Sequence, residues 1–337
     1  MYRPRIFIGS STEGLEVGKA LEGLLEREAE AILWTRGVFR AGHGALEALE
    51  SIKDSLDAAV LILTPDDVIE SRNLTIMGPR DNVVFELGFF TGQLGRRRCF
   101  LLYNRDLSLK IPSDLEGVTP LTYGSRSDSN LRAALGPACT ELMNRCRELG
   151  PFDGLLLGRN GSFLRRGARE RPIIYWAARH RNTAKNSAIK EYLNFMHGWD
   201  EHHVTPSLDD IVTLVADKSV HVCGSFRNET AMQKLRESRL GSVVRELVLP
   251  KDVIDLQAAR PSDYPWQARE EAIRIQEVAD MALAILPRYG MDTSWQIGYA
   301  VGRGQQIIGW LSNDYGFRIE RALIWDHWMH GWRLVIL

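Results

Sequence analysis

Runs of consecutive apolar residues alternate with amphipathic stretches along the first half of the chain. The runs lie at residues 5–8, 31–34, 58–63 and 99–103, and their length and aliphatic content are typical of β-strands. The run at 58–63 shows no alternation of apolar and polar positions, as expected for a strand that is buried on both faces. Strands separated by helical stretches in this order predict an α/β fold with a parallel sheet.

Apolar positions spaced three or four residues apart predict helices between these strands. Ser10 and Glu13 have the Ser-x-x-Glu arrangement of a capping box, so the first helix is expected to begin just after Gly9. A further helix is expected from about Asn130 to Leu149. The periodic apolar positions are Val17, Leu21, Leu24 and Leu25 in the first helix, Leu46, Leu49, Ile52 and Leu56 in the second, and Leu131, Leu135, Leu142 and Met143 in the last.

The second half of the chain restarts this alternation after a basic stretch that contains several glycines. Its apolar runs lie at residues 173–176, 220–222, 281–286 and 306–308. A length of 337 residues fits about two domains of ordinary size. We therefore predict two flavodoxin-like, doubly wound parallel-sheet domains in tandem, at residues 1–150 and 171–337, joined by a linker at 151–170.

The composition restricts the classes of function that the chain can have. Apolar residues make up 45% of the chain and charged residues 25%, and no stretch resembles a membrane span or a signal peptide. A net charge of −1 without a long basic run argues against direct binding of nucleic acid. The four cysteines lack the spacing of metal ligands and fit reduced thiols. These features predict a cytoplasmic protein with no membrane contact and no bound metal, which acts on a small ligand.

Three loops follow strands of the first domain, at the edge where open α/β sheets bind their ligands. Residues 9–13 could bring backbone amides to a phosphate, or they could simply form a well-capped turn before a helix. Trp34 could stack on a base or a nicotinamide ring, although an aromatic residue at a strand end often serves packing. In the third loop, residues 79–92, polar residues lead into an apolar helix.

Glu86 is a carboxylate among the apolar residues of that helix. Burying an ionised carboxylate is costly, so a glutamate between Phe85 and Leu87 is a candidate functional group. The structural alternative is an ion pair of Glu86 with Arg80 or Arg36. Cleavage of an N-glycosidic bond gives the ribose oxocarbenium character, which one carboxylate can stabilise. The nicotinamide of NAD is already activated by its positive charge, so Glu86 alone could support its release.

Four segments of the first domain resemble, in the same order, the prokaryotic TIR-like family of TIR-STING and cyclic-pyrimidine-activated antiphage effectors. They are residues 5–13, 63–68, 79–88 and 111–118, and the resemblance covers residues 4–122. It implies a flavodoxin-like fold, cleavage of NAD as substrate without a cofactor, and activation by ordered self-association. It also implies roles for individual residues: Glu86 is catalytic, Gly9, Ser10 and Ser11 lie along the NAD phosphates, Trp34 forms an aromatic wall, and Arg80, Asp81 and Asn82 lie at the entrance.

The second half resembles the nucleoside 2-deoxyribosyltransferase family over residues 218–312. Where that family has a nucleophilic glutamate before Ile-Gly-Tyr-Ala, this chain has Gln296, and an amide cannot replace a carboxylate nucleophile. The resemblance then implies a domain that recognises a nucleoside or nucleotide without reacting with it. The residues expected to contact this ligand are Gly224, Ser225 and Arg227 at a phosphate, and Asp292 or Gln296 at a ribose or base.

These observations lead to one principal hypothesis and two alternatives. In the principal hypothesis, a nucleotide second messenger binds the second domain, drives assembly into a homo-oligomer or filament, and activates NAD cleavage by the first domain in antiphage defence. In the first alternative, the chain binds nucleotides and assembles but performs no chemistry. In the second, the second domain cleaves or transfers nucleosides, with Asp280 or Asp292 acting in place of the missing glutamate.

Overall fold

The computed structural model describes parts of both halves of the chain, between residues 2 and 336. The described residues are 2–36, 38, 45–71, 74–111, 120–152, 155–157, 163–165, 174–178, 208–223, 229–249, 275–276, 278–286, 291–311 and 332–336. The chain divides into two compact units. The first comprises Met1–His43, Ala48–Ala168 and Ser294–Arg303, and the second comprises Gly44–Glu47, Arg169–Thr293 and Gly304–Leu337.

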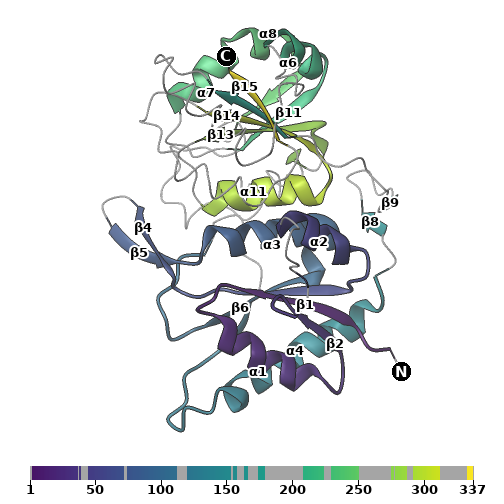
Figure 1. The fold of residues 1–337 in the computed structure, drawn as a ribbon, viewed down its shortest axis with the longest axis vertical. Helices are drawn as coiled ribbons and strands as arrows, with labels where there is room; N and C mark the ends of the chain where they lie inside the picture. The colour runs from purple at the N-terminus through teal and green to yellow at the C-terminus, as the bar shows by residue number, and fades with distance from the viewer. Residues whose placement is uncertain are drawn as a thin grey trace. The chain divides into compact units, whose positions relative to one another are not determined.

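The first unit is built on a five-stranded sheet in the order β2-β1-β3-β6-β7 (Figure 1). All of its pairings are parallel, and this is the strand order of flavodoxin-like sheets. The four predicted strands are confirmed, and β7 is an additional short edge strand. The strands are β1 (Arg5–Ser10), β2 (Glu30–Leu33), β3 (Ala58–Ile62), β6 (Cys99–Asn104) and β7 (Leu121–Tyr123).

Helices cover both faces of this sheet, which explains why β3 is apolar at every position (Figure 1). The helices are α1 (Leu15–Leu25), α2 (Ala45–Lys53), α3 (Asp81–Leu94) and α4 (Leu131–Leu149). α1 and α4 pack on the face that carries Ile6 and Ile8. α3 covers the opposite face, where the rings of Phe7 and Phe90 lie 4.6 Å apart between centroids. The predicted helix at 130–149 is therefore confirmed, with Asn130 as its N-cap.

The predicted start of the first helix, just after Gly9, is wrong. β1 continues to Ser10, and α1 begins at Leu15 after a turn. The hydroxyl of Ser10 accepts a hydrogen bond from Trp34 instead of capping a helix. Ser11 takes part of that role, because its hydroxyl accepts a hydrogen bond from the Gly14 N–H at 3.2 Å. The Ser-x-x-Glu pattern thus lies in the strand and the turn that precede the helix.

A β-hairpin between β3 and α3 departs from the predicted alternation of strands and helices. It consists of β4 (Asp67–Ser71) and β5 (Leu74–Gly78), which pair antiparallel to each other and do not join the five-stranded sheet. The N–H of Asp66 donates to the carbonyl of Gly78 at 2.9 Å, which closes the base of the hairpin. The chain therefore leaves the hairpin directly at residues 79–80, immediately before α3.

The second unit contains a parallel sheet in the order β12-β11-β13-β14-β10-β15. The predicted strands at 173–176, 220–222, 281–286 and 306–308 are confirmed. Its core packs the helices α6, α7 and α8 against one face of β11 and β13. The strands are β10 (Ile174–Ala178), β11 (Ser219–Cys223), β12 (Glu246–Val248), β13 (Met281–Leu286), β14 (Gln306–Leu311) and β15 (Trp332–Ile336), and the helices are α6 (Leu208–Val215), α7 (Glu229–Arg236) and α8 (Arg239–Val243). The helix α11 (Met291–Gly302) lies between β13 and β14 along the chain, and its residues from Ser294 onward belong to the first unit.

The stretch predicted as a linker, residues 151–170, contains two short strands. β8 (Leu155–Leu157) and β9 (Phe163–Arg165) pair antiparallel. Because only part of this stretch is described, the boundaries predicted at residues 150 and 171 stay predictions. None of the helices in the described parts of the chain is long and apolar enough to cross a membrane.

Candidate functional site

The candidate site lies where β1 ends and α3 begins. α3 starts at Asp81 and carries Glu86 in its second turn, on the side that faces β1. Gly9, in β1, is so close to Glu86 that a Cβ on Gly9 would lie 2.8 Å from Glu86 Oε2. The structure therefore brings together two of the residues that the sequence singled out, from segments more than seventy residues apart.

Glu86 is a buried carboxyl group with no cationic partner among the described residues. Only 5% of the residue is exposed, and Oε2 has no hydrogen-bond partner within the described part of the chain. Burial raises the pKa of Glu86 to about 8, because the apolar surroundings disfavour the charged form. A carboxyl group with this pKa is mostly protonated near neutral pH and becomes ionised when a cationic group arrives beside it.

Gly9 provides the space in which the Glu86 carboxyl group lies. Besides meeting Glu86, a Cβ at this position would lie 2.5 Å from Leu61 Cδ1 and 2.9 Å from Phe7 Cε1. These separations are well below van der Waals contact, so any side chain here would displace the carboxyl group or its apolar neighbours. The absence of a side chain at Gly9 thus leaves room for the Glu86 carboxyl group.

Two hydrogen-bonded groups hold the other polar residues at this edge of the sheet. The Trp34 indole N–H donates to the Ser10 hydroxyl at 3.0 Å, which fixes the half-buried ring beside the end of β1. The hydroxyls of Ser11 and Thr64 lie 2.9 Å apart, and Thr64 donates to Asp66 Oδ2 at 2.8 Å. Both serines are buried, and through these hydrogen bonds their side chains hold Trp34, after β2, and Thr64, after β3, in place.

Arg80 and Arg36, the ion-pair partners expected for Glu86 in the structural alternative, pair with other glutamates. Arg80 pairs with Glu13 at 2.5 Å, and Arg36 pairs with Glu22 at 3.3 Å. Both pairs are partly exposed. The Arg80–Glu13 pair joins the β1–α1 loop to the start of α3, and the adjacent Asp81 and Asn82 are half-buried in the first turn of α3. The role of these three residues 80–82 at the entrance of the site stays a prediction.

Three residues of this edge were missing from the predicted site, namely Glu13, Thr64 and Asp66. All three lie in segments on which the family resemblance rests, 5–13 and 63–68. The contacts of Glu13 with Arg80 and of Thr64 with Ser11 join loops that are far apart in the sequence, so no local spacing indicates them.

The residues predicted to contact a ligand in the second half are only partly described. Gly224, Ser225 and Arg227 lie outside the described residues. Asp292 and Gln296 are half-buried on α11, in its first and second turns. His221 on β11 was not among the predicted ligand contacts, and it is buried, with 3% of the residue exposed.

Comparison with known proteins assigns the first domain. Residues 5–125 match the family model of the CAP12/Pycsar effector protein TIR domain. The N-terminal domain is a CAP12/Pycsar TIR domain. The chain is 45% identical over 148 residues to the Pycsar effector protein PaPycTIR of Pseudomonas aeruginosa. It is 39% identical over 147 residues to BcPycTIR of Burkholderia cepacia, and 37% identical over 121 residues to CD-NTase-associated protein 12 of a Lachnospiraceae bacterium.

These similarities concern the TIR domain and leave the second half of the chain unassigned. The PaPycTIR match covers 43% of this chain and 48% of the relative, and the Lachnospiraceae match covers 36% and 38%. The chain thus spans about half the length, or less, of the curated relatives it matches. The resemblance of residues 218–312 to nucleoside 2-deoxyribosyltransferases stays a prediction.

Proposed function

We propose that this chain is a Pycsar-type effector of antiphage defence that cleaves the nicotinamide–ribose bond of NAD at Glu86. The observation that carries the proposal is a buried glutamate with no cationic partner among the described residues, beside the carboxyl end of β1 in a TIR domain. A structural glutamate in this position would be expected to form an ion pair, whereas the nearby arginines pair elsewhere.

The chemistry requires one carboxylate and no strong general acid. The bond between ribose C1′ and the nicotinamide nitrogen breaks, and its electron pair neutralises the positive charge of the pyridinium ring. The ribose is left with oxocarbenium character, which the Glu86 carboxylate stabilises in surroundings of low dielectric. Water then adds to C1′ and loses a proton, so that the products are nicotinamide, ADP-ribose and one proton.

The raised pKa of Glu86 suits a substrate that is cationic at the reacting end. In the free protein near pH 7 the carboxyl group is mostly neutral, which limits the cost of burying it. A pyridinium ring placed beside the carboxyl group favours its ionised form, because opposite charges attract strongly where water is excluded. Binding of NAD would then generate the charged form that the reaction needs.

The other residues of the site fit the remaining parts of NAD. The Trp34 ring, held by Ser10, offers a flat surface for the nicotinamide or adenine ring. Arg80 is exposed and can exchange its Glu13 partner for the diphosphate of NAD. The buried side chains of Ser10 and Ser11 then fix the segment from Gly9 to Glu13, which would lie against the phosphates.

The second half supplies regulation in this proposal. Free NAD-cleaving activity would be toxic, so the unliganded protein must be mostly inactive, and a nucleotide-type signal must bind the active arrangement more tightly. Self-assembly of several chains is the expected route to that arrangement. Gln296 at the position of a nucleophile suits a domain that binds its ligand without consuming it.

The proposal is tested by measuring nicotinamide release from NAD by the purified full chain. Parent protein, Glu86→Gln and the matched control Glu141→Gln, an exposed glutamate on α4, are compared with and without a panel of cyclic mono-, di- and trinucleotides. We expect release by the parent and by Glu141→Gln that depends on one of the nucleotides. Glu86→Gln should lose at least about a hundredfold in rate, because the charge at the transition state is no longer balanced.

Two results would contradict the proposal. Undiminished release by folded Glu86→Gln would remove Glu86 from the mechanism. Tight binding of NAD without release under any of the nucleotides would favour a module that binds nucleotides but performs no chemistry.

A further inference from the structure

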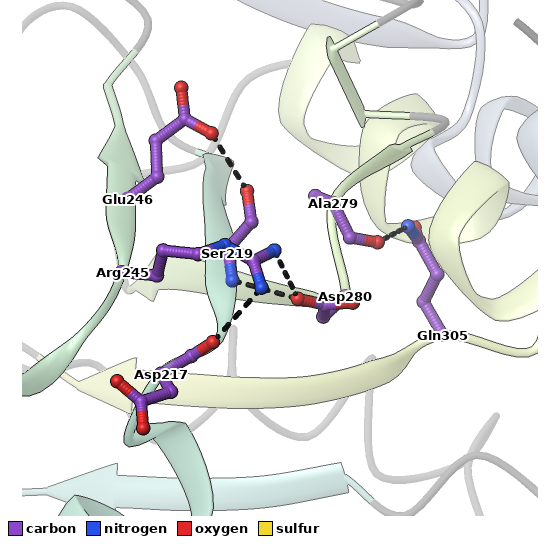
Figure 2. Close-up of polar contacts among 7 residues, drawn as sticks. All are labelled: Asp217, Ser219, Arg245, Glu246, Ala279, Asp280 and Gln305. Carbon is purple, nitrogen blue, oxygen red and sulfur yellow. Dashed lines mark hydrogen bonds and ion pairs between the residues drawn. The ribbon is translucent and has the colours of Figure 1, made fainter.

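The strands β1 and β11, each second from the edge of its sheet, are fixed in the same way at their first residues. In the first sheet, the Arg5 N–H donates to Asp57 Oδ2, and the Asp57 N–H donates to the Arg5 carbonyl, both at 2.9 Å. In the second sheet, Ser219 and Asp280 form the same two bonds, again both at 2.9 Å. Figure 2 shows the Asp280 carboxylate beside Ser219. Asp57 immediately precedes β3, which pairs with β1, and Asp280 immediately precedes β13, which pairs with β11.

The agreement extends to the strand on the other side. Arg5 pairs in register with Glu30, and Ser219 pairs in register with Glu246. The side chains also meet in both sheets: Arg5 Nε lies 3.2 Å from Glu30 Oε1, and the Ser219 hydroxyl donates to Glu246 Oε2 at 3.2 Å (Figure 2). The strand orders β2-β1-β3-β6 and β12-β11-β13-β14 therefore correspond strand by strand.

The pairing registers of β1 with β3 and of β11 with β13 determine which residues of β1 and β11 correspond. Gly9 pairs with Leu61, four residues after Asp57, and Cys223 pairs with Ala284, four residues after Asp280. Cys223 therefore occupies the position of Gly9. By the same register, His221 occupies the position of Phe7.

The helices that follow these strands carry the same residue pattern. Residues 85–92 read Phe-Glu-Leu-Gly-Phe-Phe-Thr-Gly, and residues 295–302 read Trp-Gln-Ile-Gly-Tyr-Ala-Val-Gly. α11 lies between β13 and β14 along the chain, just as α3 lies between β3 and β6. Although Ser294–Arg303 groups with the first unit, its place in the chain is that of α3 in the first repeat. By this residue pattern and this order of elements, Gln296 corresponds to Glu86.

The differences between the repeats remove the reactive group and alter its surroundings. Gln296 is uncharged at the position of Glu86, and Cys223 adds a side chain at the position where Gly9 leaves room for the carboxyl group. His221 adds a polar ring where Phe7 is apolar. Neither ring nitrogen of His221 has a hydrogen-bond partner among the described residues, and burial lowers the pKa of His221 to about 4. A neutral imidazole has one donor and one acceptor to offer.

We propose that residues 217–311 are a second copy of the nucleotide-binding fold of the TIR domain, and that this copy binds an NAD-class dinucleotide without cleaving it. The proposal rests on the NAD site proposed at Glu86, and it names the class of ligand for the second half. The carboxamide of Gln296 can exchange hydrogen bonds with ribose hydroxyls. It has no negative charge with which to stabilise an oxocarbenium ion, so the bound dinucleotide persists.

The proposal predicts a binding equivalent of NAD that depends on Gln296. NAD is titrated by calorimetry into the full-length Glu86→Gln variant, which removes turnover, and into the same variant with Gln296→Met added. Methionine is close to glutamine in size and preserves packing. The matched control is Gln233→Met in the same background, an exposed position on α7. Thermal unfolding of each variant checks the fold. We expect one equivalent to disappear with Gln296→Met and to remain with Gln233→Met.

The outcomes separate this proposal from the proposed function. If the folded Gln296→Met and Gln233→Met variants bind the same number of NAD molecules per chain, the second site is overturned. In that case nicotinamide release by the parent would still support Glu86. Conversely, a Gln296-dependent equivalent in a protein that never releases nicotinamide would support the second site and contradict the proposed function. If Gln296→Met fails to fold, Gln296→Leu is titrated in its place against the same control.

Discussion

At the scale of single residues, the behaviour of Glu86 depends on what is missing around it. Gly9 has no side chain where the carboxyl group lies, and Oε2 has no partner among the described residues. Such a group is destabilising when ionised, and groups with pKa values shifted in this way cluster at functional sites. The same residue should therefore be detectable through stability as well as through activity.

The first prediction concerns the pH dependence of that stability. The pKa of Glu86 is about 8 in the folded protein and near its ordinary value of 4.5 in the unfolded chain, so the folded state binds the proton more tightly. Stability from Glu86 is therefore fully present below about pH 4.5 and is lost as the pH rises towards 8. We expect Glu86→Gln to become progressively more stable than the parent over this range, at most by about 1.4 kcal/mol per unit of pKa shift.

Urea unfolding of both proteins at several pH values between 5 and about 8.5 measures this difference. Glu141→Gln, at an exposed position on α4, serves as the control and should show no such trend. A constant difference between Glu86→Gln and the parent across the range would show that Glu86 is not a destabilised carboxyl group.

At the scale of elements, caps and turns decide where the helices of the TIR domain begin. The side chain of Asn130 accepts a hydrogen bond from the Ala133 N–H at 3.0 Å, which satisfies a donor in the first turn of α4. At the other end of α4, Arg98 donates to the carbonyls of Leu149 and Gly150, both at 2.9 Å. α4 is thus fixed at both ends, far along the chain from α3, the helix that carries Glu86.

The second prediction is that Asn130→Ala destabilises the protein by about 1 kcal/mol without changing the chemistry at Glu86. The substitution removes the N-cap acceptor and leaves the first-turn N–H without its side-chain partner. Chemical denaturation gives the change in free energy, and nicotinamide release gives the activity. A loss of activity in fully folded Asn130→Ala would show that α4 affects the site, which its position on the opposite face of the sheet does not explain.

At the scale of the whole molecule, each half of the chain contains a parallel sheet, and the strand orders β2-β1-β3-β6 and β12-β11-β13-β14 correspond. The helix α3 before β6 carries Glu86, and the helix α11 before β14 carries Gln296. In the proposed function, a half that binds its ligand without consuming it suits regulation of the half that cleaves NAD. Regulation by assembly then makes activity depend on the number of chains that meet.

The third prediction follows from this dependence on assembly. At a fixed concentration of the activating nucleotide, the rate of nicotinamide release per chain should rise with protein concentration, because assembly follows mass action. Light scattering under the same conditions should rise in parallel. A rate per chain that stays constant over a hundredfold range of concentration, with no change in scattering, would exclude activation by assembly.

The sequence by itself determined much of the local structure, because strands and helices depend on nearby residues. The apolar runs predicted β1, β2, β3 and β6, and the periodicity of residues 131–143 predicted α4. Glu86 could be selected as a candidate because a carboxylate among apolar residues is unusual wherever the chain folds. The hairpin β4–β5 was not predicted, because the sequence of two short antiparallel strands shows no periodic pattern that distinguishes it from the sequence of a loop.

Only the tertiary structure decided the relations between residues that are distant in the sequence. The partners of Arg80 and Arg36, the space at Gly9 beside Glu86, and the equivalence of Asp57 with Asp280 all depend on long-range packing and strand register. Few residues are identical at corresponding positions of the strands in the two sheets, since many sets of apolar side chains of suitable size can form such a core. The matching bonds of Asp57 and Asp280 and the matching strand registers are therefore seen only once the strands are paired in the tertiary structure.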